Sequence, residues 1–302
     1  MTVSFSSLAI QSIILLLPHF FLSSCNCETV SVSSDDNIDN MIWSSLNPHF
    51  SSHVGTIAFF CIDCQSLNPE TVSFWKFLTP FLIVGVPLVL ILKEPDLGTG
   101  LLLVPILFSM LYLWGVKKRY LFLMVLAAVL ASPVLFSCLK EYQKTRLMVF
   151  INPNVDPLGA GYTIIQSKIA IGSGGFLGKG FMGGTQNQLN FVPERHTDFI
   201  FPVIAEEGGL LASLAVILLF GWIAKKGFEI ASQTPDRFGS ELACGITVFL
   251  ACQVIMNLGM TMGLLPVVGV PLPLVSYGGS SVVITMLSIG LLLNIKMHRP
   301  LF

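Results

Sequence analysis

Long apolar stretches that are almost free of charge restrict this chain more than any other feature of its sequence. Hydrophobic residues account for 53% of the 302 positions and charged residues for only 11%, whereas a soluble domain carries about 25% charged residues. A helix that crosses a bilayer needs about 17–25 mostly apolar residues. Stretches that approach or reach this length lie at 77–92, 97–116, 120–139, 199–224, 242–263 and 274–295. The sequence therefore predicts an all-α polytopic membrane protein with about six transmembrane helices.

The first quarter of the chain differs from the rest. Residues 1–75 contain no Lys or Arg and are rich in Ser. Residues 8–25 could form an N-terminal hydrophobic helix, although the basic residues that open a signal peptide are missing. The polar stretch 28–52 is typical of a poorly ordered linker. We therefore predict an atypical, partly disordered region over 1–75 and a membrane domain over 76–302.

Short basic loops predict the orientation of the spans. Lys and Arg residues lie together at 117–119, between 225 and 237, and in the C-terminal tail. Alternating spans place all three groups on one side, and the positive-inside rule makes that side cytoplasmic. The segment 140–197 is then a large extracytoplasmic loop, and Asp198 lies at the outer surface of the membrane.

A cluster of ionisable residues stands where this outer segment meets the next apolar stretch. The chain places Glu194, Arg195, His196 and Asp198 close together there, and ionisable groups near hydrocarbon are costly unless they are paired, hydrated or used. The outer segment also carries basic side chains that suit a phosphate group through charge-assisted hydrogen bonds. A solvated basic surface is the alternative. The basic residues in question are Lys144, Arg146, Lys168, Lys179 and Arg195.

Two segments are rich in residues that disturb regular structure. The glycine-dense stretch 172–180 could converge backbone N–H groups on an anion or could be a flexible connector. The apolar stretch 263–281 contains three prolines and should not form one continuous helix. Irregular backbone at membrane depth must be buried in protein or line a cavity. We predict a re-entrant loop that ends near Ser276 and Tyr277, with a tight interhelical turn as the alternative.

Several strings of this sequence occur together in a characteristic order. They are EPDLGT at 94–99, DPLGAGY at 156–162, IQSKIAIGSGG at 165–175, GTQ at 184–186, VPERHTDFIFPVIAEE at 192–207, and the stretch 263–281. In order and spacing they resemble the SEDS family (shape, elongation, division, sporulation), most closely its rod-shape branch. The family's first spans have no counterpart in residues 1–75, and a truncated reading frame or an unusual N-terminus would explain that difference.

The resemblance implies a multi-pass protein of the bacterial cytoplasmic (inner) membrane whose active site is on the outer face. Its implied activity is the polymerisation of lipid II, a disaccharide-peptide on undecaprenyl diphosphate, into glycan strands for cell elongation and cell shape. The resemblance also implies a class B penicillin-binding protein as partner and Asp198 as the catalytic residue. The net charge of −1 gives no reason to expect nucleic-acid binding.

Glycan polymerisation requires a sugar hydroxyl to attack an anomeric carbon while a lipid diphosphate leaves. Asp198 is the candidate general base for this hydroxyl, and a helix N-cap is its alternative role. The five basic residues above are candidates to offset the diphosphate charge, and a divalent cation could do so too. Glu194, Ser276 and Tyr277 complete the predicted substrate site.

Glu206 and Glu207 stand roughly 12–14 Å along a helix from Asp198, so we predict for them a structural polar network that lines a cavity, with ion binding as the alternative. A lipid flippase or transporter would also suit intramembrane acids and broken helices. An inactive scaffold for a transpeptidase is the remaining alternative.

Overall fold

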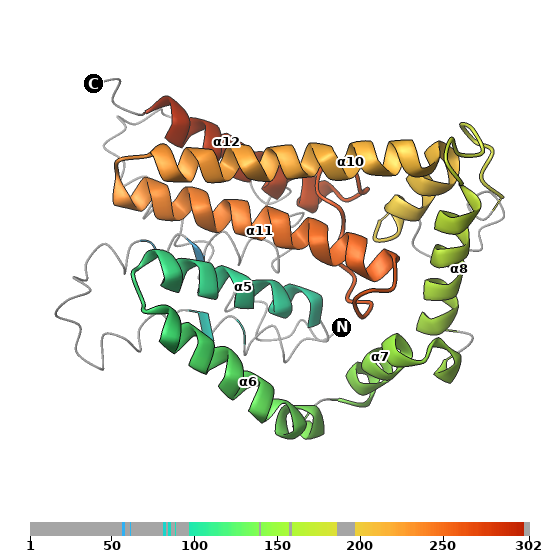
Figure 1. The fold of residues 1–302 in the computed structure, drawn as a ribbon, viewed down its shortest axis with the longest axis horizontal. Helices are drawn as coiled ribbons and strands as arrows, with labels where there is room; N and C mark the ends of the chain where they lie inside the picture. Colours follow the sequence, from blue (N-terminus) through green and yellow to red (C-terminus); the bar gives the residue numbers. More distant parts are fainter. Residues whose placement is uncertain are drawn as a thin grey trace, which may run out of the picture.

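The computed structural model describes residues 56–57, 61, 81–82, 84–85, 88, 97–138, 140–156, 159–185 and 197–298. All regular structure in these residues is helical, which confirms the predicted fold class (Figure 1). The helices are α5 (Leu97–Leu113), α6 (Lys118–Cys138), α7 (Glu141–Ile151), α8 (Ala160–Ser173), α10 (Ile200–Gln233), α11 (Arg237–Thr261) and α12 (Gly279–Met297), with a 3₁₀ turn at Pro153–Val155. The predicted helix at 8–25 and most of the predicted span 77–92 lie outside the described residues.

Three of these helices, α10, α11 and α12, are long and apolar enough to cross a membrane. Helices α5 and α6 occupy two further predicted spans, and α5 is a shorter apolar helix. The predicted outer segment 140–197 is not a structureless loop, because α7, the 3₁₀ turn and α8 lie within it.

Helix α11 is the centre of the described bundle. It packs against α5, α8, α10 and α12, and most of its apolar window is buried, whereas less than a third of that window is buried in α10 and in α12. A helix that is apolar on all sides is suited to such a central position. The main core joins α11 to α5 through fully buried side chains: Leu102, Leu103, Ile106, Met110, Ile246 and Phe249.

The three basic segments predicted to share one side lie at the same end of the bundle. Figure 1 shows the α5–α6 turn, the α10–α11 turn and the end of α12 together, while α7 and α8 lie at the opposite end. Some predicted boundaries were wrong: for example, α10 continues past 224 to Gln233, so the connection to α11 is only a short turn. An ion pair between Lys226 and Glu229 (2.8 Å) supports this extension of the helix.

Helix α10 is broken near its start. Gly209 has φ 65° and ψ −160°, a conformation essentially restricted to glycine. The segment before the break, residues 200–208, is called the leading segment below. Backbone hydrogen bonds between the glycine-dense stretch and α10 replace the helical bonds lost at the break: Lys179 N to Glu206 O (3.0 Å), Gly180 N to Glu207 O (3.0 Å), Leu210 N to Gly175 O (2.9 Å) and Leu211 N to Phe176 O (3.4 Å).

The glycine-dense stretch therefore has a role that neither sequence interpretation included. The N–H groups of Lys179 and Gly180 bind carbonyl oxygens of α10, so they do not form an anion cradle, and the stretch is held too closely for a flexible connector. Added Cβ atoms at Gly174 or Gly178 would lie only 2.0 Å from carbonyl oxygens of α10. The glycines permit this close contact between two backbones. The contact gives hydrogen bonds to the N–H and C=O groups at the break, which lipid hydrocarbon could not provide.

Replacing Gly209 by Ala is expected to destabilise the folded protein. The backbone conformation alone costs about 1–3 kcal/mol for a non-glycine residue, and the new Cβ would lie 2.3 Å from the backbone nitrogen of Gly178. Thermal unfolding in detergent measures the effect. Gly221→Ala is the control on the same helix, because a Cβ there meets no atom within 4 Å; equal unfolding midpoints for the two variants would contradict the prediction.

Candidate functional site

Asp198 lies in the turn that leads into α10 and is half-buried. The N-cap position of α10 is Phe199, so Asp198 does not occupy the capping position that was its alternative role. The carboxylate instead approaches the loop between α11 and α12. A Cβ built on Gly269 of that loop would lie 3.3 Å from Oδ2 of Asp198.

Asn257 of α11 anchors the main chain of Asp198. Its side chain is fully buried, and Nδ2 donates to the carbonyl oxygen of Asp198 (2.8 Å) and to that of Val270 (2.7 Å). One amide group therefore joins the start of α10 to the α11–α12 loop. The Oδ1 atom of Asn257 has no hydrogen-bond partner among the described residues.

The α11–α12 loop, residues 262–278, is the irregular segment that the prolines predicted. It turns back against the helices with Val268, Val270 and Leu272 buried, whereas Leu264 and Gly269 are exposed. Ser276 is buried; its Oγ donates to the carbonyl oxygen of Thr197 (2.5 Å) and accepts from the N–H of Leu272 (2.8 Å). The predicted substrate ligand Ser276 thus ties the loop to the residue before Asp198.

Two of the predicted basic residues lie against this same loop. Arg146 of α7 donates from Nη1 to the carbonyl oxygen of Val267 (3.4 Å). Lys168 of α8 is exposed, and a Cβ built on Gly263 would lie 2.6 Å from its Nζ. The loop therefore contacts Lys168 at Gly263, Arg146 at Val267 and the carboxylate of Asp198 at Gly269.

The remaining predicted ligands are engaged elsewhere or lie outside the described residues. Lys144 pairs with the exposed Glu141 on α7 (3.0 Å), and Lys179 pairs with buried Glu206 (2.7 Å). Tyr277 is 80% exposed. Glu194 and Arg195, like His196, lie outside the described residues.

Tyr277 forms one rim of a shallow pocket at the start of α10. The pocket has a volume of about 650 Å³ and is lined by Ile200, Val275, Ser276, Tyr277, Gly278, Gly279 and Val282. Ile200 follows Asp198 by two positions, but Asp198 itself does not line this pocket.

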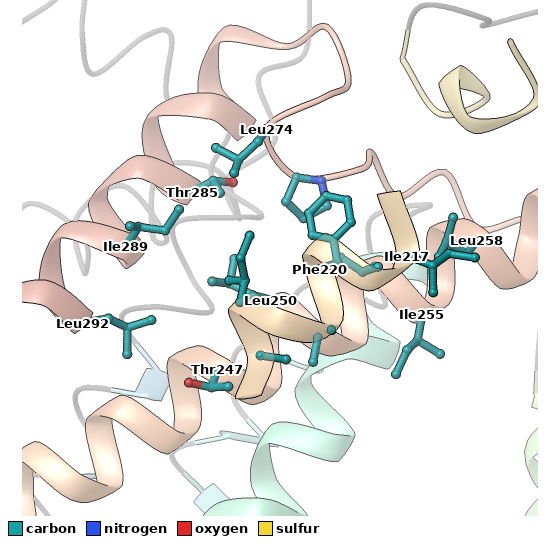
Figure 2. A pocket seen from close by; sticks show the side chains of 16 residues that line it. Ile217, Phe220, Thr247, Leu250, Ile255, Leu258, Leu274, Thr285, Ile289 and Leu292 are labelled. Carbon is teal, nitrogen blue, oxygen red and sulfur yellow. The ribbon is translucent and has the colours of Figure 1, made fainter. Parts of the chain in front are cut away.

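A second pocket, of about 230 Å³, lies between α10, α11 and α12. Figure 2 shows side chains from all three helices around it, with Leu274 of the α11–α12 loop at one end. The hydroxyls of Thr247 and Thr285 donate to carbonyls of their own helices (2.7 Å each), so they do not make the wall polar. Such a pocket suits a hydrocarbon chain better than a polar group.

Asn257 lies in the apolar stretch 242–263 and was assigned no role at the site from the sequence. The signal was its amide, because a polar side chain in an apolar span needs a partner. Its partners lie 59 and 13 positions away, and no local pattern identifies them. In the part of the chain that the structure describes, no three His, Cys, Asp or Glu residues gather as a metal site.

Sequence comparison finds similarity over most of the chain. The sequence profile of the FtsW/RodA/SpoVE family, described as cell cycle protein, matches residues 52–300. Peptidoglycan glycosyltransferase MrdB of Escherichia coli K12 is 46% identical over 220 residues, which cover 72% of this chain and 60% of that relative. Probable peptidoglycan glycosyltransferase FtsW of Thioalkalivibrio sulfidiphilus is 40% identical over 230 residues, 75% of this chain and 56% of that relative. The chain thus spans less than two thirds of the length of these relatives.

Solved structures share the fold. A structure described as a peptidoglycan synthase complex that coordinates polymerization and crosslinking superposes with a TM-score of 0.72 at 29% identity, covering 98% of this chain and 82% of the matched chain. A variant of the rod shape determining protein RodA from Thermus thermophilus superposes with a TM-score of 0.60 at 23% identity, covering 97% of this chain and 78% of that one. The second likeness concerns the fold alone.

Proposed function

Because the chain belongs to the FtsW/RodA/SpoVE family of cell cycle proteins, we propose that it is a peptidoglycan glycosyltransferase that polymerises lipid II into glycan strands during cell elongation and cell-shape maintenance. Relatives named peptidoglycan glycosyltransferase support this activity. The observation that carries the proposal is the anchoring of Asp198. Asn257 and Ser276 hold the main chain on either side of its carboxylate, beside a loop that two cations also contact.

In this mechanism the carboxylate of Asp198 accepts the proton of the attacking sugar hydroxyl as the glycosidic bond forms. Arg146 and Lys168, which lie against the α11–α12 loop, offset the negative charge that develops on the departing lipid diphosphate. Further proposed substrate contacts are Lys144, Glu194, Arg195, Ser276 and Tyr277, whereas Lys179 is engaged by Glu206. A divalent cation could add to the countercharge.

The orientation follows from the basic end of the bundle. If the α5–α6 turn, the α10–α11 turn and the end of α12 face the cytoplasm, then Asp198, at the opposite end of α10, faces outward. We place the active site on the outer face of the bacterial cytoplasmic membrane. A class B penicillin-binding protein is the proposed partner, because strands made on that face are crosslinked there.

Incubation of the purified chain with lipid II, with and without a class B penicillin-binding protein, tests the proposal. Glycan strands resolved by gel electrophoresis are the expected product. If lipid II instead stays monomeric and the chain moves it across a vesicle bilayer, the protein is a flippase and the proposal is wrong. Binding of the penicillin-binding protein without polymer in any condition would identify a scaffold.

A further inference from the structure

The leading segment of α10 connects two charged residues with different surroundings. Asp198 lies immediately before it, and Glu206 lies near its end, just before the break at Gly209. The helical rise from Ile200 to Glu206 alone is about 9 Å, so Glu206 does not reach the reacting atoms. The side chain of Glu206 is fully buried, and a buried carboxylate within an apolar helix is costly unless it is paired.

The partners of Glu206 come from the glycine-dense stretch and the residues that follow it. Its Oε1 accepts from Nζ of Lys179 (2.7 Å) and from Oγ1 of Thr185 (3.3 Å), and Lys179 Nζ also donates to Thr185 (3.1 Å). On the other side of the carboxylate, a Cβ at Gly184 would lie 2.8 Å from Oε2. The carboxylate is therefore enclosed on both sides by one short piece of chain.

The backbone at this point cannot hold the leading segment by itself. At Gly209 the helix leaves its regular conformation, so the direction of residues 200–208 depends on contacts with other parts of the chain. The backbone bonds from Lys179 and Gly180 reach the carbonyls of Glu206 and Glu207. The ion pair between Lys179 and Glu206 lies at the same point and adds a charged contact to these neutral ones.

We infer that Lys179 and Glu206 are positioning residues, whose ion pair holds the leading segment at the angle that sets Asp198 against the α11–α12 loop. This inference rests on the proposed function and deepens it. A misplacement of about 1 Å at a reacting group can lower a rate up to about 100-fold. Breaking the pair leaves a buried group without its partner and loosens the segment, which then presents Asp198 less accurately.

Glu206→Gln and Lys179→Met test the inference in a lipid II polymerisation assay. Each variant is expected to lower kcat about tenfold or more and to leave KM for lipid II within about twofold. Lys179→Arg keeps the charge and is expected to restore most of kcat. The matched controls are Lys226→Met and Glu229→Gln, because this pair lies on the same α10 at a similar distance (2.8 Å) but is largely exposed; both should stay within about twofold of wild type.

Hydrogen–deuterium exchange supplies a readout that does not need activity. Glu206→Gln is expected to raise exchange in residues 197–208 while α11 keeps its wild-type protection. Wild-type kcat in Glu206→Gln, or an equal rise of exchange in α11, would overturn the positioning role. If wild-type protein makes no polymer, the proposed function fails, and the exchange measurement alone still decides whether the pair holds the leading segment.

Discussion

Replacing Asp198 by Asn is expected to lower the rate of glycan-strand formation by about 10²–10⁴-fold, the usual contribution of a general base. Asn has nearly the same shape, so the carboxamide should fit beside Gly269 where the carboxylate lies now. The main chain is held by Asn257 and Ser276, whose bonds do not involve the carboxylate. The variant should therefore keep these two main-chain anchors and lose the ability to accept the proton.

Initial rates with saturating lipid II, measured by gel electrophoresis of the strands, check this prediction. Glu229→Gln serves as control, because it also neutralises an acid. Glu229 lies near the end of α10 that is away from the α11–α12 loop. The control should retain wild-type activity. An Asp198→Asn variant that retains more than about one tenth of the wild-type rate would show that another group takes the proton.

The helices could be predicted because length and composition determine which segments cross hydrocarbon. The ends of the helices depend on contacts that composition does not record. Helix α10 passes the predicted end at 224, where the Lys226–Glu229 pair and exposed polar residues let it continue outside the apolar region. Helix α12 begins at Gly279 rather than at 274, because residues up to 278 remain in the loop that holds the site.

At the candidate site, too, short stretches of sequence indicate single residues but not the contacts that these residues make with distant parts of the chain. Asp198 and Ser276 were both assigned to the predicted site, but the contacts that hold Asp198 in place could not be predicted. Ser276 contacts Thr197 across 79 positions, and Glu206 contacts Lys179 across 27. The structure confirms that Glu206 belongs to a polar network, as expected for a buried charge, which requires a partner. Its partner Lys179 had been predicted to bind phosphate instead. The charge of a lysine does not indicate which anion it binds.

Replacing Asn257 by Leu is expected to lower both stability and activity. Leu fills a similar volume but donates no hydrogen bond, so the carbonyl oxygens of Asp198 and Val270 lose the amide that now joins them. Each buried acceptor left without a donor costs about 1–3 kcal/mol, partly offset because the unpartnered Oδ1 of Asn257 is removed as well. We expect a net loss of about 1–3 kcal/mol in the free energy of unfolding.

The activity of Asn257→Leu should fall further than its stability explains, because the variant releases the backbone of Asp198 from the α11–α12 loop. Thermal unfolding and polymerisation at a temperature well below the unfolding midpoint separate the two effects. Thr247→Val is the matched control on α11: it also removes a buried polar group, but its hydroxyl bonds only to Ala243 of the same helix. If Asn257→Leu polymerises lipid II as fast as Thr247→Val, the amide stabilises the fold without positioning the base.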